Sequence, residues 1–372
     1  MISQLSLLVY HFQYVDLAPY IVFLGLLFAI MSLNETVKSR VILMTIVILL
    51  FTCFRYDIGY DYGAYKRIAL GLNNDEFERV ELFDKVLLSI AMFTNLYQLF
   101  FILTSLIIYI PLSWFCLKHS RDPELSLLVY LFYPFMFLES MSAVRNYMAF
   151  SMILIALSMI IQKRIKASLI WIFVAFGFHL SALFALLLIP VYKIKLKKAL
   201  LWGMWIGSFL LTIVLERYLA NVQSDNYLIL LFLRSVDAKQ QGGQVFTYLL
   251  NIICFAVLLL WDKLKLLKDE NEGLLRLVFA GVCIWNLLAF DFVTRSRLSM
   301  YFLLPLLLII PELKEIIEVK GLQIRRLLIY VLLAIFSSSF FINIKANLDN
   351  GTKISYLPYQ TFISHVDYER NE

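Results

Sequence analysis

Charged residues are scarce in this chain of 372 residues: Asp, Glu, Lys and Arg make up 16% of it, while 61% is hydrophobic. A soluble domain carries about 25% charged residues, so this composition excludes a soluble globular protein. Apolar runs recur from Leu17 to Asn343, and about 20 apolar residues suffice to cross the hydrocarbon of a bilayer. The gaps between the runs are too short for a sizeable extramembrane domain.

Motifs for metals and nucleotides are also missing. The sequence contains no Asp-x-Asp, His-Glu-x-x-His or Gly-x-x-x-x-Gly-Lys pattern, so we expect no metal and no cofactor. The cysteines lie in or beside apolar runs without metal-ligand spacing, and we interpret them as side chains buried in the membrane. They are Cys53, Cys116, Cys254 and Cys283. We expect no secretory signal, because the first basic residue is Lys38.

The net charge of +6 comes from basic residues in short loops. These residues do not alternate with aromatic residues on a polar surface, so we expect no nucleic-acid partner. Short cytoplasmic loops carry the Lys and Arg excess of membrane proteins. If all the basic loops lie on that side, neighbouring loops are separated by an even number of crossings. The loops are 38–40, 118–121, 163–166, 193–198, 263–268 and 314–326.

The pattern therefore predicts an all-α, polytopic integral membrane protein, formed by residues 1–372 as a single domain. We expect about twelve transmembrane helices, both termini outside, and an outward-facing recessed cavity. The predicted spans are 17–33, 41–54, 95–116, 125–138, 146–161, 168–178, 180–190, 199–215, 246–261, 274–292, 298–311 and 327–343.

One stretch decides this count. As a continuous helix, Ala167 to Pro190 would be about 36 Å long and would cross once. A single crossing would place the basic 193–198 loop outside. We therefore predict two half-helices broken at Gly177-Phe178-His179, which bring His179 into the membrane from the outer side.

Two outer segments have a pattern of their own. Residues 82–94 are predicted to form an interfacial helix, because apolar and polar residues occupy different faces. The apolar face holds Phe83, Val86, Leu87, Ile90 and Phe93, and the polar face holds Asp84, Lys85 and Ser89. The largest external loop, 216–245, is predicted to act as a mobile lid.

Ionisable side chains near membrane depth are costly and usually form pairs or serve a function. In this sequence they gather at the predicted outer turns and comprise Arg55, Asp61, Glu139, Arg145, His179, Arg295 and Arg297. Several arginines around one cavity favour a diphosphate, which a guanidinium binds bidentately. A lipid-linked donor would present that group. Asp61 or His179, with Glu139 and Asp57 as further candidates, could then act as general base on an acceptor hydroxyl, while arginines stabilise the leaving diphosphate.

Simpler roles exist for each of these residues. Arg297 could be an interfacial anchor whose charge reaches the headgroups. His179 could be a structural histidine at a helix break. Asp61 could cap a turn or pair with Arg55.

Short segments, taken in chain order, carry a resemblance to a known family. They are Arg55 with Gly59-Tyr60-Asp61-Tyr62 and Tyr65, Arg145 with Ala149, Phe178-His179-Leu180-Ser181 before a run ending at Pro190, Arg297 with Tyr301-Phe302, and Tyr356-Leu357-Pro358-Tyr359. The sequence resembles the EpsG/Wzy-type polymerases of O-antigen, capsule and exopolysaccharide assembly. The resemblance adds Tyr62 and Tyr65 to the candidates for binding the diphosphate or glycan, which are otherwise Arg55, Arg145, Arg295, Arg297 and Glu139.

The resemblance implies a bacterial inner-membrane glycosyltransferase. Such an enzyme joins undecaprenyl-diphosphate-linked oligosaccharide repeat units at the outer face, and its partners are that lipid, the bilayer, a flippase and a chain-length regulator. Two alternatives stay open. An O-antigen ligase uses the same donor with another acceptor. A lipid-linked oligosaccharide flippase, or another transporter, would distribute polar residues along a path to the cytoplasmic side.

Overall fold

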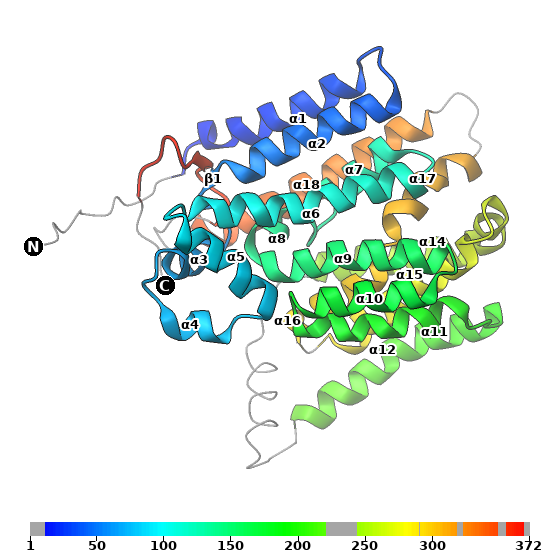
Figure 1. Cartoon of the computed structure of the whole chain (residues 1–372). Helices are drawn as coiled ribbons and strands as arrows, with labels where there is room; N and C mark the ends of the chain where they lie inside the picture. Colours follow the sequence, from blue (N-terminus) through cyan, green and yellow to red (C-terminus); the bar gives the residue numbers. More distant parts are fainter. Residues whose placement is uncertain (1–11, 221–243, 290, 318–322, 349–354, 368–372) are drawn as a thin grey trace, which may run out of the picture. The chain divides into compact units, whose positions relative to one another are not determined.

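Helices form nearly all of the secondary structure in the computed structural model, which describes residues 12–220, 244–289, 291–317, 323–348 and 355–367 (Figure 1). Within these ranges the strands are β1 (Arg55–Tyr56) and β2 (Gln360–Thr361). They pair antiparallel, with Arg55 opposite Thr361. The all-α class is confirmed.

The chain divides into two compact units, which are described separately. The first unit contains residues 1–155, 177–180 and 319–372. Its helices are η1 (Tyr14–Leu17), α1 (Ala18–Met31), α2 (Val37–Cys53), α3 (Tyr62–Ala69), α4 (Asn74–Arg79), α5 (Leu82–Phe93), α6 (Gln98–His119), α7 (Pro123–Phe132), α8 (Phe137–Ser142), most of α9 (Val144–Ile161) and α18 (Ile324–Leu348). α2 packs against α1, α6 and α7, and α7 packs against α18.

The second unit contains residues 156–176 and 181–318. Its helices are α10 (Ile165–Phe176), most of η2 (Leu180–Leu187), α11 (Leu188–Lys193), α12 (Lys198–Ala220), α14 (Gln244–Leu267), α15 (Asn271–Leu287), α16 (Phe292–Leu303) and α17 (Leu306–Ile316). α15 packs against α11, α12, α14 and α16. It is therefore the central helix of this unit, and its buried residues include Trp285 and Asn286.

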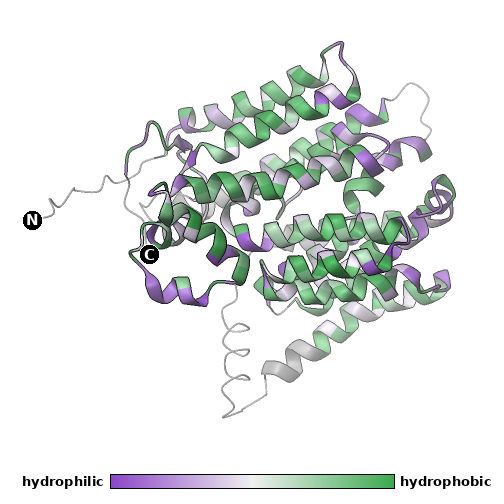
Figure 2. Cartoon of the chain, viewed as in Figure 1, coloured by the Kyte–Doolittle hydropathy of each residue, from purple (hydrophilic) through white to green (hydrophobic). Residues whose placement is uncertain are grey.

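Helix occupies most of each of the twelve predicted spans. In the described part of the chain, four helical stretches are long and apolar enough to cross a membrane alone, or five with the bent pair α16–α17. Within each unit, hydrophobic residues cover the middle of the long helices and hydrophilic residues gather at their ends (Figure 2). These features fit a multi-pass membrane protein but do not establish the count of twelve.

Two predicted spans are not continuous helices, and proline explains both interruptions. α7 ends at Phe132 because Pro134 disfavours helical backbone at the preceding Tyr133, which is extended. α16 and α17 meet at Pro305 with a bend of 55°. Proline lacks an N–H and its ring clashes with the preceding helical turn, so a kink forms there.

Basic loops of the first unit meet at one end. Arg40, near the start of α2, pairs with Glu124 at the start of α7. Arg325, at the start of α18, pairs with Glu124 and also with Asp122, where Nε lies 2.8 Å from Oδ2. The ends of α2 are about 25 Å apart at 1.5 Å per residue. Arg55, which follows α2, therefore lies at the other end of this unit.

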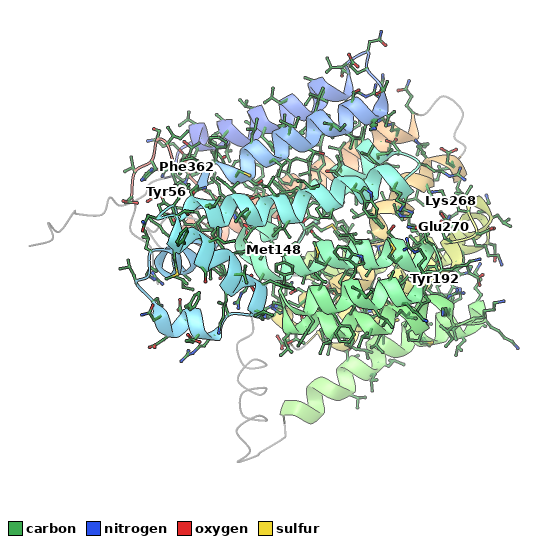
Figure 3. The ribbon with its side chains drawn as sticks, in the orientation of Figure 1. Tyr56, Met148, Tyr192, Lys268, Glu270 and Phe362 are labelled. Carbon is green, nitrogen blue, oxygen red and sulfur yellow. The ribbon has the colours of Figure 1, made fainter. Side chains whose placement is uncertain are left out.

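A similar end exists in the second unit. Lys198 Nζ lies 3.0 Å from Asp262 Oδ2, and Lys268 Nζ lies 3.4 Å from Glu312 Oε1. Tyr192, Lys268 and Glu270 are seen at this end in Figure 3. Within each unit, contacts thus connect basic loops that the sequence assigns to one side.

Glu124 should be a principal stabilising residue of the first unit, because its 2% exposed side chain is shared by Arg40 and Arg325. We expect Glu124→Ala to lower the free energy of unfolding by about 2–3 kcal/mol, since hydrogen bonds to charged groups contribute about 1.5–3 kcal/mol and Arg325 keeps Asp122 as a partner. Thermal unfolding in detergent measures this. The control is Glu78→Gln, which breaks an exposed pair with Lys85 and should change stability by less than about 0.5 kcal/mol. Equal effects of the two substitutions would contradict the interpretation.

Candidate functional site

The turn between β1 and α3 is fixed by two other segments of the first unit. Gly59 has a φ of 102°, and its N–H donates to Ser355 O at 2.7 Å. Tyr60 N donates to Ser142 Oγ at 3.1 Å. A Cβ on Gly59 would collide with the backbone of Met141. This turn, which carries Asp61 into α3, therefore requires glycine.

Tyr356 connects the C-terminal segment to α8. Its hydroxyl donates to Glu139 Oε1 at 3.2 Å and lies 3.0 Å from Ser142 Oγ. Burial raises the pKa of Glu139, the hydrogen bond from Tyr356 lowers it, and the charge of Asp61 raises it. Asp61 and Glu139 are therefore close enough to interact electrostatically.

Arg145 and its neighbours form what we call the Arg145 cluster: Tyr65, Glu81, Asp84 and Arg145. Arg145 Nη1 lies 2.8 Å from Glu81 Oε2, and their side chains are 32% and 25% exposed. Arg145 Cζ lies 5.8 Å from the ring centroid of Tyr65. The guanidinium thus joins α9 to the starts of α3 and α5 and stays within reach of solvent.

Asp84 is the buried member of this cluster. It follows Glu81 by three residues and is 0% exposed, and neither carboxylate oxygen accepts a hydrogen bond from another described residue. Burial raises the pKa of Asp84 to about 8; the charge of Arg145 and the backbone N–H of Asp84 itself lower it, and the charge of Glu81 raises it. This carboxyl group is therefore mostly protonated at neutral pH.

The prediction that Asp84 lies on a solvated polar face of the 82–94 helix is wrong. Asp84 shares the buried face of α5 with Leu88 and Ala91, and α5 packs against α3 and α6. The exposed face is apolar and includes Val86, Ile90 and Phe93. The expected apolar face is therefore present, and its placement in the membrane interface stays a prediction.

The helix breaks where the sequence predicted, between α10 and η2. Phe83 N donates to Gly177 O at 3.1 Å, and the rings of Phe83 and Phe178 lie 5.0 Å apart. A Cβ on Gly177 would strike the Phe83 ring. The break that carries the partly buried His179 is thus fixed to the start of α5, beside the Arg145 cluster.

Arg55 lies in the interior of the first unit rather than in the Arg145 cluster. It is 1% exposed, and its Nη1 donates to Thr52 O at 2.6 Å and to Ser105 Oγ at 3.1 Å. Its Cζ lies 5.2 Å from the Phe101 ring centroid. These contacts fix the end of α2 against α6.

Tyr62 and Tyr65 also contribute to packing. Tyr62 stacks on Phe101 at 4.1 Å between centroids and donates to Gln98 Oε1 at 3.2 Å. Tyr65 stacks on Phe100 at 4.9 Å and is 3% exposed. Tyr65 alone of this pair is a member of the Arg145 cluster.

Arg295 and Arg297 lie in α16 of the second unit and differ in environment. Arg295 is 6% exposed, and its Cζ lies 4.6 Å from the Trp285 ring centroid and 5.1 Å from that of Phe292. Arg297 is exposed. Two arginines two residues apart thus point to different sides of one helix, one into aromatic packing and one outward.

Sequence reasoning did not select Glu81 and Asp84 as site residues. Helical spacing offered one signal, since Asp84, Leu88 and Ala91 recur at i, i+4 and i+7 and so share one face. No comparable signal in one sequence pairs Glu81 with Arg145, because that contact joins residues far apart in the chain.

Two further predictions concern a metal site and the lid. In the described ranges, no group of three His, Cys, Asp or Glu side chains is placed to hold a metal ion. Most of the predicted lid, 216–245, lies outside the described residues.

With this geometry established, comparison with known families identifies the chain. A family model described as the EpsG family matches residues 38–361. The chain belongs to the EpsG family. No curated protein and no solved structure matches it. The EpsG match covers the Arg145 cluster, the break at 177–179 and the segment through β2. EpsG membership and the apolar helices together support a multi-pass membrane protein related to polysaccharide polymerases.

Proposed function

We propose that this EpsG-family protein is a polysaccharide polymerase, a membrane glycosyltransferase that joins undecaprenyl-diphosphate-linked oligosaccharide repeat units on the outer face of the bacterial inner membrane. The observation that best supports the proposal is the partly exposed Arg145, held among acids and an aromatic ring in a chain of this family. A guanidinium binds phosphate oxygens bidentately and remains charged in apolar surroundings.

The proposed topology places the two ends of the first unit on opposite sides of the membrane. The end with Arg40, Glu124 and Arg325 is cytoplasmic, because basic residues concentrate there. The Arg145 cluster and the break at His179 are then outside, facing a recessed cavity. Twelve helical segments cross, and both termini are outside.

Each candidate residue receives a role in this proposal. Arg145 binds the donor diphosphate in place of Glu81, and the exposed Arg297 of the second unit stays a glycan-binding candidate predicted from the sequence. Arg55 and Arg295, which are buried, position their helices. Glu139 holds Tyr356 beside the turn that carries Asp61, and Tyr62 and Tyr65 pack behind that turn.

The remaining role is that of the base. Asp61 and His179 are the bases predicted from the sequence. Loss of a general base typically lowers a rate about 10²- to 10⁴-fold. Such a loss in Asp61→Asn or in His179→Gln would identify that residue as the base, and a smaller loss in both variants would assign the role to another residue.

Expression in a polymerase-null strain tests the function. We expect a ladder of surface glycan on a gel, and a flippase and a chain-length regulator in the same strain should influence its amount and length. Single capped repeats without a ladder would contradict the proposal. Transfer of preformed polymer to a lipid core would instead identify a ligase.

Purified protein provides the second test. With synthetic lipid-linked repeats it should form polymer and release undecaprenyl diphosphate, and EDTA should not lower the rate. Movement of lipid-linked repeats across a vesicle bilayer without that release would identify a flippase.

A further inference from the structure

The buried carboxyl group of Asp84 lacks a hydrogen bond from another residue of the described part of the chain. Such groups are hydrogen-bonded in the great majority of cases, and an exception calls for an explanation. Asp84 is 0% exposed, and no other residue in the described part of the chain donates a hydrogen bond to either of its oxygens. Packing does not require an acid here, since its neighbours on the same face are Leu88 and Ala91.

The groups that face Asp84 come from several elements of the first unit. α9 contributes Arg145, α3 contributes Tyr65, and α5 itself contributes Glu81. The break with His179 adjoins through the hydrogen bond from Phe83 to Gly177. α6 faces α5 with the aromatic residues Phe100 and Phe101 of the same packed core. Asp84 thus lies among one cation, one further acid and a phenol.

Both partners of the Arg145–Glu81 ion pair act electrostatically on Asp84, and both are partly exposed. Partly exposed ion pairs contribute little free energy and exchange partners readily. An anionic ligand with two phosphates would compete with Glu81 for the guanidinium. Release of Glu81 would give a ligand hydroxyl access to Asp84.

We infer that Asp84 is the proton acceptor for glycosyl transfer, and that it becomes accessible when the donor diphosphate replaces Glu81 on Arg145. This inference rests on the proposed function. The acceptor sugar hydroxyl gives its proton to the Asp84 carboxylate, and its oxygen forms a bond to the anomeric carbon of the donor. The bond from that carbon to the diphosphate oxygen breaks, and the electron pair leaves with undecaprenyl diphosphate. Asp84 then returns the proton to water.

The acidity of Asp84 suits this task. A base works best when its pKa lies near the working pH, and burial raises that of Asp84 to about 8. The active form is the carboxylate, so the rate should rise with pH and level off above about 8. A purely structural aspartate would produce no such rise.

The test compares purified wild type with Asp84→Asn and Asp84→Glu, using synthetic undecaprenyl-diphosphate-linked repeats. Asp84→Asn should lower the release of undecaprenyl diphosphate about 100-fold or more and remove the pH-dependent rise. It should still bind undecaprenyl diphosphate, followed by tryptophan fluorescence. Asp84→Glu should restore part of the rate, and its rate should rise at a different pH from that of wild type. The control is Asp75→Asn, an exposed acid of α4, which should match wild type.

Each other outcome overturns the inference. The inference is wrong if the Asp84→Asn rate stays within threefold of wild type at every pH. It is also wrong if Asp84→Asn no longer binds undecaprenyl diphosphate. If Asp84→Asn unfolds in detergent, the pH dependence of the Asp84→Glu rate decides. A rate that rises at a different pH from wild type supports the inference, and an unchanged pH dependence contradicts it. A wild-type protein that releases no undecaprenyl diphosphate overturns the proposed function itself, and the role of Asp84 with it.

Discussion

Arg145→Ala should lower polymer formation about 100-fold or more, because one positioned donor to a developing charge is typically worth 10² to 10³ in rate. Arg145 is partly exposed and lies beside the acids Glu81 and Asp84. Arg145→Lys should recover only part of the loss, since an ammonium cannot bind a diphosphate bidentately. The measurement is release of undecaprenyl diphosphate in vitro, together with the glycan ladder in cells.

Two controls separate this effect from loss of the ion pair. Arg79→Ala removes an exposed arginine at the end of α4 and should leave the ladder unchanged. Glu81→Gln removes the partner of Arg145 but leaves the guanidinium free for the donor, so its rate should stay within about threefold of wild type. If Glu81→Gln and Arg145→Ala were equally inactive, the pair would be structural and the proposed diphosphate site would be wrong.

Gly59→Ala should cause a large loss of stability at the turn between β1 and α3. The φ of 102° at this position is unfavourable for any residue with a Cβ, at a cost of about 1–3 kcal/mol. The new Cβ would also meet the backbone of Met141, which cannot move aside as a side chain could. We expect a melting temperature in detergent lowered by several degrees and loss of the glycan ladder, because the turn carries Asp61.

Gly63→Ala is a close control, four residues further along in α3. Its Cβ would meet only the end of the Arg67 side chain at 4.0 Å, and alanine favours helix over glycine by about 1 kcal/mol. Its melting temperature should be unchanged or slightly raised. A Gly63→Ala variant as damaged as Gly59→Ala would show that this segment tolerates no change, whatever the local geometry.

Features that depend on neighbouring residues could be predicted from the sequence. The apolar runs predicted the helices, and the length of the 167–190 stretch together with the basic loop after it predicted the break at Gly177. Pro134 and Pro305 are equally visible in the sequence, yet the spans that contain them were predicted as continuous helices. Proline lacks an N–H and also disfavours helical backbone at the preceding residue, so both interruptions could have been predicted.

Features that depend on distant residues could not be predicted in this way. The interior position of Arg55 results from Thr52 and Ser105, and Ser105 lies on another helix. The face on which Asp84 lies was ambiguous, because α5 has apolar residues on both faces and only packing against α3 and α6 selects the buried one. A pair such as Arg145 with Glu81 joins segments 64 residues apart, which hydropathy does not specify.

The pairing of β1 with β2 bears on when the protein becomes active during its synthesis. Ser355, Tyr356 and β2 close the turn around Gly59 and Glu139, and the ribosome reaches them only after α18 has been made. A nascent chain with every described helix already inserted therefore still lacks this part of the site. Under the proposed function, an unfinished chain is therefore not expected to use lipid-linked sugars before translation has passed β2.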